Sequence, residues 1–220
     1  MMKRIVALIL MTLSCVLLLS GCGGERMLAR KVTTTVTTGE VAEERYSYKD
    51  GRLSKVETLT DGEVSSSVSY EYDENGYPVL KISDGMSGER VEITNDSQGR
   101  VIEEKTTLSF GMGEAVFTTF YEYTDENGSY TKRTVAEGNT ISTEIYTLDE
   151  HGEPIRIEIP GVSDIRVSNS YNDLGQLTEQ TRYAQMTAVT KHEYNSDSTL
   201  KKTSYYIAGT LISETEYFYE

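Results

Sequence analysis

The sequence predicts an all-β protein, built as an antiparallel meander of about 16 short strands. Turn signals recur at intervals close to 23 residues, and a second turn signal falls between each pair. The segments between turns are seven to nine residues long, which is the usual length of a strand. They are rich in Thr, Val, Ile and Tyr, and the chain holds only 3 prolines. A helical period is not sustained outside the N-terminal segment.

The N-terminal segment is typical of a bacterial export signal. Two basic residues precede an apolar run from Ile5 to Leu19, which is too short to predict a membrane span. The run ends in "LLSGC", which resembles the lipobox of bacterial lipoproteins. The resemblance implies cleavage between Gly21 and Cys22 and a diacylglycerol on the Cys22 thiol. The alternative is an ordinary secretory signal in which the cysteine is incidental.

These features divide the chain into a signal peptide (1–21), a lipid-anchored tether (22–30) and a β-repeat domain (31–220). A lipoprotein with more than one acyl chain, palmitate among them, is held firmly at a membrane surface. We therefore expect the domain on the extracytoplasmic face of the cell membrane. Cys15 leaves with the signal peptide, so the mature chain has no thiol for a disulfide, a metal site or a nucleophile.

The charge balance argues against a nucleic-acid partner. The full chain has a net charge of -14, from 21 basic and 35 acidic residues. Removing Lys3 and Arg4 with the signal leaves 19 basic residues against 35, a net charge of -16. Such a surface repels nucleic acids and anionic headgroups.

Glycines or their equivalents define the repeat. The main turns are centred on positions 51, 76, 99, 128, 152, 175 and 198, which are 25, 23, 29, 24, 23 and 23 residues apart. Strands joined by such short turns are antiparallel neighbours. The first predicted strand is "KVTTTVTT" (Lys31–Thr38) and the last is "LISETEYFYE". We expect a curled sheet or an open barrel-like shape rather than full closure, with the low-charge first strand free to pair with another chain.

The repeat resembles the YD repeat of the RHS family, with a consensus of approximately Tyr-x-Tyr-Asp-x-x-Gly-Arg-Leu. The matching stretches are "YSYKDGRL" (46–53), "YEYDENGYPV" (70–79), "NDSQGRV" (95–101) and "YNDLGQL" (171–177). Short Tyr/Gly hairpin repeats also occur in MORN-like proteins and in sheet-rich, porin-like lipoproteins. RHS proteins are far longer, form shells and often carry a C-terminal toxin, so the resemblance extends to the repeat and not to that role.

The sequence does not predict an enzyme, a cofactor or a metal site. Asp-Glu-Asn-Gly turns at Asp73–Gly76 and Asp125–Gly128 offer oxygen ligands, but each has too few for a calcium loop. The competing interpretation is a hairpin loop in which Asp caps the turn with its own side chain. His151 and His192 are far apart in sequence and have no ligand partner at zinc spacing.

The tyrosines are the most informative residue type, since there are 16 of them, with 4 phenylalanines and no tryptophan. Two interpretations stay open: packed cross-strand ladders, or an exposed platform for sugar rings or a partner protein. The candidate platform residues are Tyr46, Tyr70, Tyr121, Tyr171 and Tyr194.

The function predicted from these features is a lipid-anchored binding or interaction module of the bacterial cell envelope, with a glycan or an envelope protein as its partner. The alternative is a carrier or assembly factor that shelters an apolar ligand inside the curled sheet, which requires a continuous apolar concave face. The oligomeric state does not follow from the sequence.

Overall fold

The computed structural model describes residues 26–85, 88–111, 113–124 and 128–220, and these residues form sixteen β-strands. The strands are, in chain order, β1 (Leu28–Thr35), β2 (Val41–Lys49), β3 (Arg52–Thr60), β4 (Glu63–Tyr72), β5 (Pro78–Asp84), β6 (Gly88–Asn95), β7 (Val101–Phe110), β8 (Gly113–Tyr123), β9 (Tyr130–Ala136), β10 (Asn139–Leu148), β11 (Pro154–Ile159), β12 (Ser163–Tyr171), β13 (Leu177–Tyr183), β14 (Thr187–Tyr194), β15 (Leu200–Ile207) and β16 (Thr210–Tyr219). The predicted all-β meander is confirmed.

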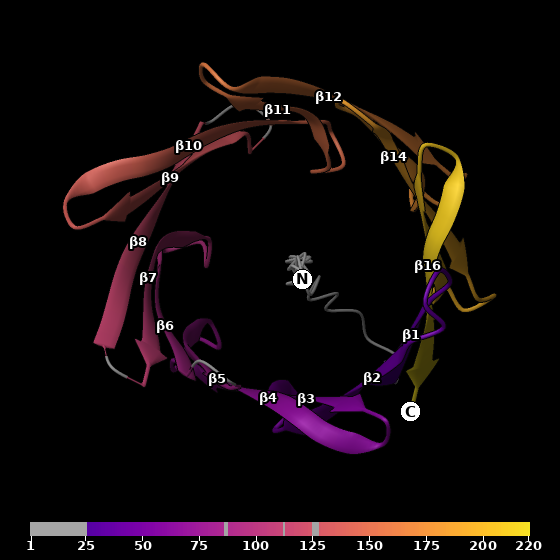
Figure 1. Ribbon diagram of the computed structural model, residues 1–220, viewed down its shortest axis with the longest axis horizontal. Helices are drawn as coiled ribbons and strands as arrows, with labels where there is room; N and C mark the ends of the chain where they lie inside the picture. The colour runs from indigo at the N-terminus through magenta and orange to yellow at the C-terminus, as the bar shows by residue number, and fades with distance from the viewer. Residues whose placement is uncertain (1–25, 86–87, 112, 125–127) are drawn as a thin grey trace, which may run out of the picture.

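The meander closes into a barrel, so the expectation of an open or curled sheet was wrong. Each strand pairs antiparallel with its neighbours in sequence, and β1 pairs with β16 to complete the ring (Figure 1). Thr33 lies opposite Thr215 at this seam, and their hydroxyls are 2.9 Å apart. Closure pairs the backbones of the two terminal strands with each other, whereas an open sheet would leave those edges unpaired. The low-charge first strand is therefore not a free edge.

The first strand begins at Leu28, three residues before the predicted start of the domain at Lys31. Leu28 pairs with Tyr219, and Met27 exchanges backbone hydrogen bonds with Glu220. Residues 27–30 of the predicted tether are thus paired with the barrel, because the last strand extends far enough to meet them.

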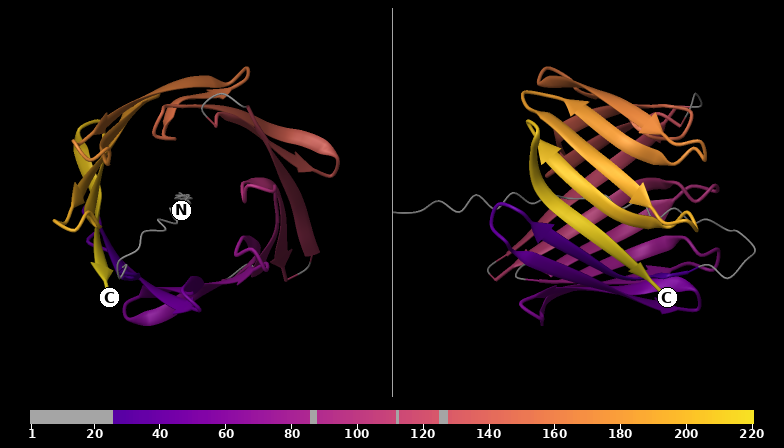
Figure 2. Two further views of the ribbon diagram at one scale, coloured as in Figure 1. Left: turned by 180° about the vertical axis from the view of Figure 1, so that it is seen from behind. Right: turned by 90° about the vertical axis from the view of Figure 1, so that its right-hand side faces the viewer.

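The two rims of the barrel differ in their turns. At the rim where even-numbered strands end, here called the long-turn rim, most hairpins are joined by five-residue loops such as 73–77 and 96–100. Several of these loops curl toward the barrel axis (Figures 1 and 2). At the opposite rim the turns are tighter: Asp61 and Gly62 have φ of 54° and 83°, as a two-residue hairpin of the Asp-Gly type requires.

The face of the sheet that carries most tyrosines is the inner wall. The Asp73 N–H donates to the Tyr77 carbonyl across the β4–β5 hairpin, so the N–H of Tyr72 points toward β3. For an L-residue, the direction of the strand and the direction of its N–H together fix the face of the sheet on which the side chain lies. With the strand order around the ring in Figure 1, these two directions place the Tyr72 side chain inside the barrel. The register then assigns alternate residues of every strand to the inner and outer walls.

The barrel is not filled by a packed core. Only five apolar side chains are buried among the described residues, and none is less than 2% exposed; the five are Leu59, Leu80, Val91, Ile157 and Val167. A sixteen-stranded barrel is wide enough to leave an aqueous interior. The inner wall is therefore a surface that faces a lumen.

Candidate functional site

Tyrosines dominate the inner wall of the barrel. By register, every tyrosine of the chain lies on this wall except Tyr183 and Tyr206, which face outward, and Tyr77, which lies in a loop. All of the inner tyrosines are partly buried. The wall thus presents aromatic rings and hydroxyl groups to the lumen.

One ring of tyrosines lies at the long-turn rim, in the last inward position of the even strands. Tyr48, Tyr72, Tyr123 and Tyr194 each donate a hydrogen bond to the carbonyl of the first or second residue of the preceding odd strand, at 3.0, 2.7, 2.9 and 2.8 Å. The neighbouring strands have stopped pairing at this level, so each hydroxyl bridges a place where the sheet has separated. We call these residues the rim latch, because each fixes one hairpin to the next.

A second ring lies two residues deeper and is coupled to carboxylates. Its members include Tyr46, Tyr70, Tyr121 and Tyr146, and we call it the lumen ring. The hydroxyls of Tyr46, Tyr121 and Tyr146 donate to Glu44, Glu104 and Glu144, each at 2.6 Å. Burial raises the pKa of these three hydroxyls above their ordinary value of 10.0, and the adjacent carboxylates raise it further.

Lysines complete this polar lining. The Lys31 ammonium lies 2.8 Å from Glu44, and Lys132 lies 3.9 Å from Glu144. The sequence interpretation missed these glutamates and lysines. The signal was present in the alternation, since Glu44 lies two residues from Tyr46 and so shares its face.

The five candidate platform tyrosines share the inner wall but not one ring. Tyr46, Tyr70 and Tyr121 belong to the lumen ring, whereas Tyr171 and Tyr194 lie at the rim level. Tyr171 differs from the rim latch, because its hydroxyl donates to the Asp149 carboxylate at 2.5 Å and its ring packs 4.1 Å from that of His151.

The aspartates of the long-turn rim act on the backbone. Asp73 Oδ1 accepts the N–H groups of Asn75 and Tyr77, at 2.9 and 2.8 Å, and Gly76 takes a φ of 89°. Asp96 and Asp149 repeat this pattern with the residues that follow them. Burial alone would raise the pKa of Asp149, but hydrogen bonds from Tyr171, Asn169 and the backbone hold it below 3.8. These turns are capped as the hairpin interpretation predicts.

Within the described residues no group of three or more His, Cys, Asp or Glu side chains could hold a metal ion. The second predicted turn, Asp125–Asn127, falls outside them. Of the histidines, His151 lies in a rim loop and His192 lies on the inner wall, 3.0 Å from the Thr203 hydroxyl. The signal peptide, Gly21 and Cys22 also lie outside the described residues, and none of those described forms a helix long and apolar enough to cross a membrane.

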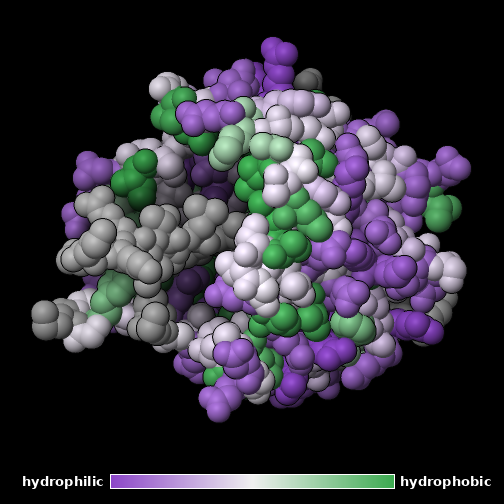
Figure 3. Space-filling model, turned by 45° about the vertical axis from the view of Figure 1, so that its right-hand side comes forward, coloured by the Kyte–Doolittle hydropathy of each residue, from purple (hydrophilic) through white to green (hydrophobic). Residues whose placement is uncertain are grey.

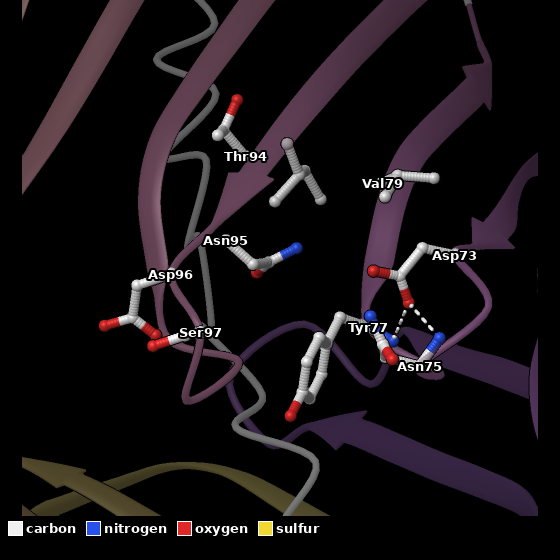
Figure 4. A pocket seen from close by; sticks show the side chains of 9 residues that line it. Asp73, Asn75, Tyr77, Val79, Thr94, Asn95, Asp96 and Ser97 are labelled. Atoms are coloured by element: carbon white, nitrogen blue, oxygen red, sulfur yellow. Dashed lines mark hydrogen bonds between the residues drawn. The ribbon is translucent and has the colours of Figure 1, made fainter.

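A cavity of about 530 Å³ opens at the long-turn rim, between the β4–β5 and β6–β7 hairpins (Figure 4). Asn95 reaches across it and donates from Nδ2 to the Pro78 carbonyl at 2.8 Å. The lining residues are Asp73, Asn75, Tyr77, Val79, Ile93, Thr94, Asn95, Asp96 and Ser97.

The outer wall is charged along its length. Ion pairs link neighbouring strands, as between Arg156 and Asp164 at 2.8 Å, and between Lys191 and Glu179 at 3.1 Å. In Figure 3 hydrophilic side chains cover the right part and the edges of the visible face, and apolar side chains form a run of patches down its middle. Exposed apolar residues such as Val41 and Val64 lie near strand ends at the tight-turn rim. Further outer ion pairs are Arg30–Glu43, Lys55–Glu57, Arg90–Glu92, Lys105–Glu92 and Lys202–Glu214.

Fold and site together define a closed, hollow barrel with an inward tyrosine lining. No protein-family model matches the chain, and no curated protein matches it. Among solved structures, a porin-like protein from Bacteroides uniformis ATCC 8492 is similar, with a TM-score of 0.58 and 11% sequence identity over 88% of this chain and 96% of that chain. This likeness is one of fold. A chain of the TcdB2-TccC3-TEV crystal structure matches 80% of this chain and 10% of its own length, at 14% identity and a TM-score of 0.36, which is too low to support a conclusion.

Proposed function

We propose that this protein is a lipid-anchored binding module of the bacterial cell envelope, which holds its ligand against the inner wall of the barrel. The observation that carries the proposal is the lining itself: partly exposed tyrosines whose hydroxyls alternate with glutamates, lysines and threonines around a wide lumen. Such a wall offers aromatic faces and hydrogen-bonding groups together, the combination that orients polar ligands.

The outer charges support a barrel that stands in water. A transmembrane barrel presents an apolar band about 25 Å tall to lipid, and an Arg or Lys at the bilayer midplane costs about 2–4 kcal/mol. In this barrel, the outward positions away from the strand ends include Arg90, Lys105 and Arg156, whose side chains are all about half-exposed. Anchoring through Cys22 would hold this domain at a membrane without requiring the strands to enter it.

The alternative of an apolar carrier fits this wall poorly. A pocket for an apolar ligand needs a continuous apolar surface, because buried charges without partners are costly. Glu44, Glu104 and Glu144 interrupt the inner wall at the level of the lumen ring. A polar ligand is therefore favoured.

The anchor is tested by labelling cells with radioactive palmitate. We expect the label on the protein to disappear in Cys22→Ala and to persist in the matched control Cys15→Ala. Label retained by Cys22→Ala would exclude lipidation at this position. The purified Cys22→Ala protein, which lacks the acyl chains, should also remain monodisperse in buffer without detergent. A barrel whose outer wall lies in lipid would aggregate under these conditions.

The binding role is tested by comparing Tyr70→Ala with Tyr183→Ala. Tyr70 belongs to the lumen ring, and Tyr183 is a tyrosine of the outer wall that is 51% exposed. In a pull-down from envelope extract, a ligand of the lumen is captured by the wild type and by Tyr183→Ala but lost with Tyr70→Ala. Equal capture by all three would show that the inner wall does not bind it.

A further inference from the structure

The tyrosine pattern is broken in one even strand. Every even strand except β6 carries a tyrosine at the rim level or at the level of the lumen ring. At these two inward positions β6 carries Ile93 and Asn95 instead. Both replacements are smaller than tyrosine, and they fall in the same strand.

Because β6 lacks these tyrosines, it lacks the aromatic side chain that fills the space between neighbouring strands elsewhere in the wall. Pairing of β5 with β6 ends at Leu80 and Glu92, so the strands separate toward the long-turn rim. At the equivalent separation of β3 and β4, Tyr72 fills the space and donates to the Leu53 carbonyl at 2.7 Å. Asn95 makes the same bridge to Pro78 with a side chain that lacks the aromatic ring. The two residues that stand in place of tyrosine, Ile93 and Asn95, both line the cavity of about 530 Å³.

The cavity has an aromatic wall in a fixed position. A Cβ atom at Gly99 would lie 2.2 Å from Cε1 of Tyr77, so the Tyr77 ring packs directly on the Gly99 backbone. Figure 4 shows Tyr77 and Asn95 on opposite sides of the opening, with Val79 on the strand beside them. One side of the cavity is therefore aromatic and aliphatic.

Both sides supply hydrogen-bonding groups. Asp73 and Asn75 lie on the side of Tyr77 and Val79, and Asn95 lies on the other side (Figure 4). Planar carboxylate and amide groups can engage two hydroxyls at once. The Oδ1 atom of Asn95 is buried and accepts no hydrogen bond from the described residues. An unsatisfied buried acceptor costs free energy, and a ligand hydroxyl would recover it once the Asn95 amide turns this oxygen into the cavity.

We propose that this gap in the tyrosine pattern is a binding site for one ring of a neutral sugar. A pyranose has an apolar C–H face, which suits the Tyr77 ring and Val79, and a rim of hydroxyls, which suits Asn75 and Asn95. The cavity volume falls within the range of about 300–1,000 Å³ that is usual for small-molecule sites. The net charge of -14 disfavours an acidic sugar. This inference rests on the proposed binding function and names the ligand class and its site.

The test is to close the gap with the residue that the repeat uses elsewhere. Asn95→Tyr restores the rim position, and its hydroxyl can reach the Pro78 carbonyl as Tyr72 reaches Leu53. Binding is measured by calorimetry on the full, purified protein, with glucose, galactose, mannose, N-acetylglucosamine and their linear tetrasaccharides as probes. We expect binding of at least one probe to weaken tenfold or more in Asn95→Tyr. Ser69→Tyr, which adds the same ring to the exposed outer wall, should bind as the wild type does.

The outcomes separate this inference from the wider proposal. If a tetrasaccharide binds the wild type and Asn95→Tyr equally, the gap is not the site, although the lumen can still be the binding wall. If no probe binds the wild type at millimolar concentration, the neutral-sugar class is overturned, whereas the comparison of Tyr70→Ala with Tyr183→Ala still decides the binding role. Should Asn95→Tyr fail to fold, Ile93→Tyr places the same ring on another lining residue of this cavity and must give the same loss.

Discussion

Replacing Tyr121 with Phe should destabilise the barrel by removing one hydroxyl from the inner wall. That hydroxyl donates to Glu104 at 2.6 Å, and the two residues are 17 positions apart on adjacent strands. Hydrogen bonds to charged groups contribute about 1.5–3 kcal/mol. Because Glu104 is only partly buried, water replaces part of the lost bond, and we expect a loss of about 1–2 kcal/mol. For a domain of this size that lowers the melting temperature by about 2–8 °C.

Thermal unfolding followed by circular dichroism measures this loss. Tyr183→Phe is the matched control, because it removes a hydroxyl from an exposed tyrosine of the outer wall, and its melting temperature should stay within about 1 °C of the wild type. The double variant Tyr121→Phe/Glu104→Gln should lose less than the sum of the two single variants, since both remove the same bond. A melting temperature for Tyr121→Phe equal to that of the control would refute the tyrosine–carboxylate coupling.

Other predictions concern the rim and the pH dependence of stability. Gly99→Ala should cost about 2–4 kcal/mol in urea unfolding, because its methyl group would meet Tyr77, whereas Gly161→Ala, with φ of 75° and open space, should cost about 1 kcal/mol; equal losses would contradict the packing of Tyr77. Burial holds the pKa of His192 below 6.5, so the free energy of unfolding should fall as the pH drops below 6.5, and His192→Gln should remove that dependence. The raised pKa of Tyr46 contributes stability that is present below pH 10 and lost above it, so alkaline unfolding should be shallower in Tyr46→Phe, and an unchanged profile would count against burial of this hydroxyl.

The strands and turns could be predicted because their signals are local. Alternation marked the inward set Phe117, Thr119 and Tyr121, and glycines marked the turns that take a positive φ, as at Gly76 and Gly152. Closure has no local signal. It depends on the register summed over all strands, which brings β1 beside β16, and no single hairpin encodes that sum.

The site was predicted in part for a similar reason. Tyrosine was identified as the informative residue type, yet Tyr171 and Tyr194 were grouped with Tyr46, although they lie two positions nearer the rim. Alternation distinguishes two faces but not which one is concave, and bulges shift the level of a residue between strands. The cavity beside Asn95 lies where β6 has no tyrosine. This absence is recognised only when residues at the same height in different strands are compared.

Closure of the barrel is the claim on which the inner wall depends, and a disulfide across the β1–β16 seam tests it most directly. Thr33 and Thr215 lie opposite each other with their hydroxyl oxygens 2.9 Å apart, so cysteines there meet the geometry of a disulfide. We predict that Thr33→Cys/Thr215→Cys loses both free thiols on mild oxidation while keeping its β-sheet spectrum. The control pair Thr33→Cys/Thr134→Cys, placed apart around the wall, should keep its thiols. Free thiols at 33 and 215 in a folded protein would mean that the sheet is open and that its tyrosines line no lumen.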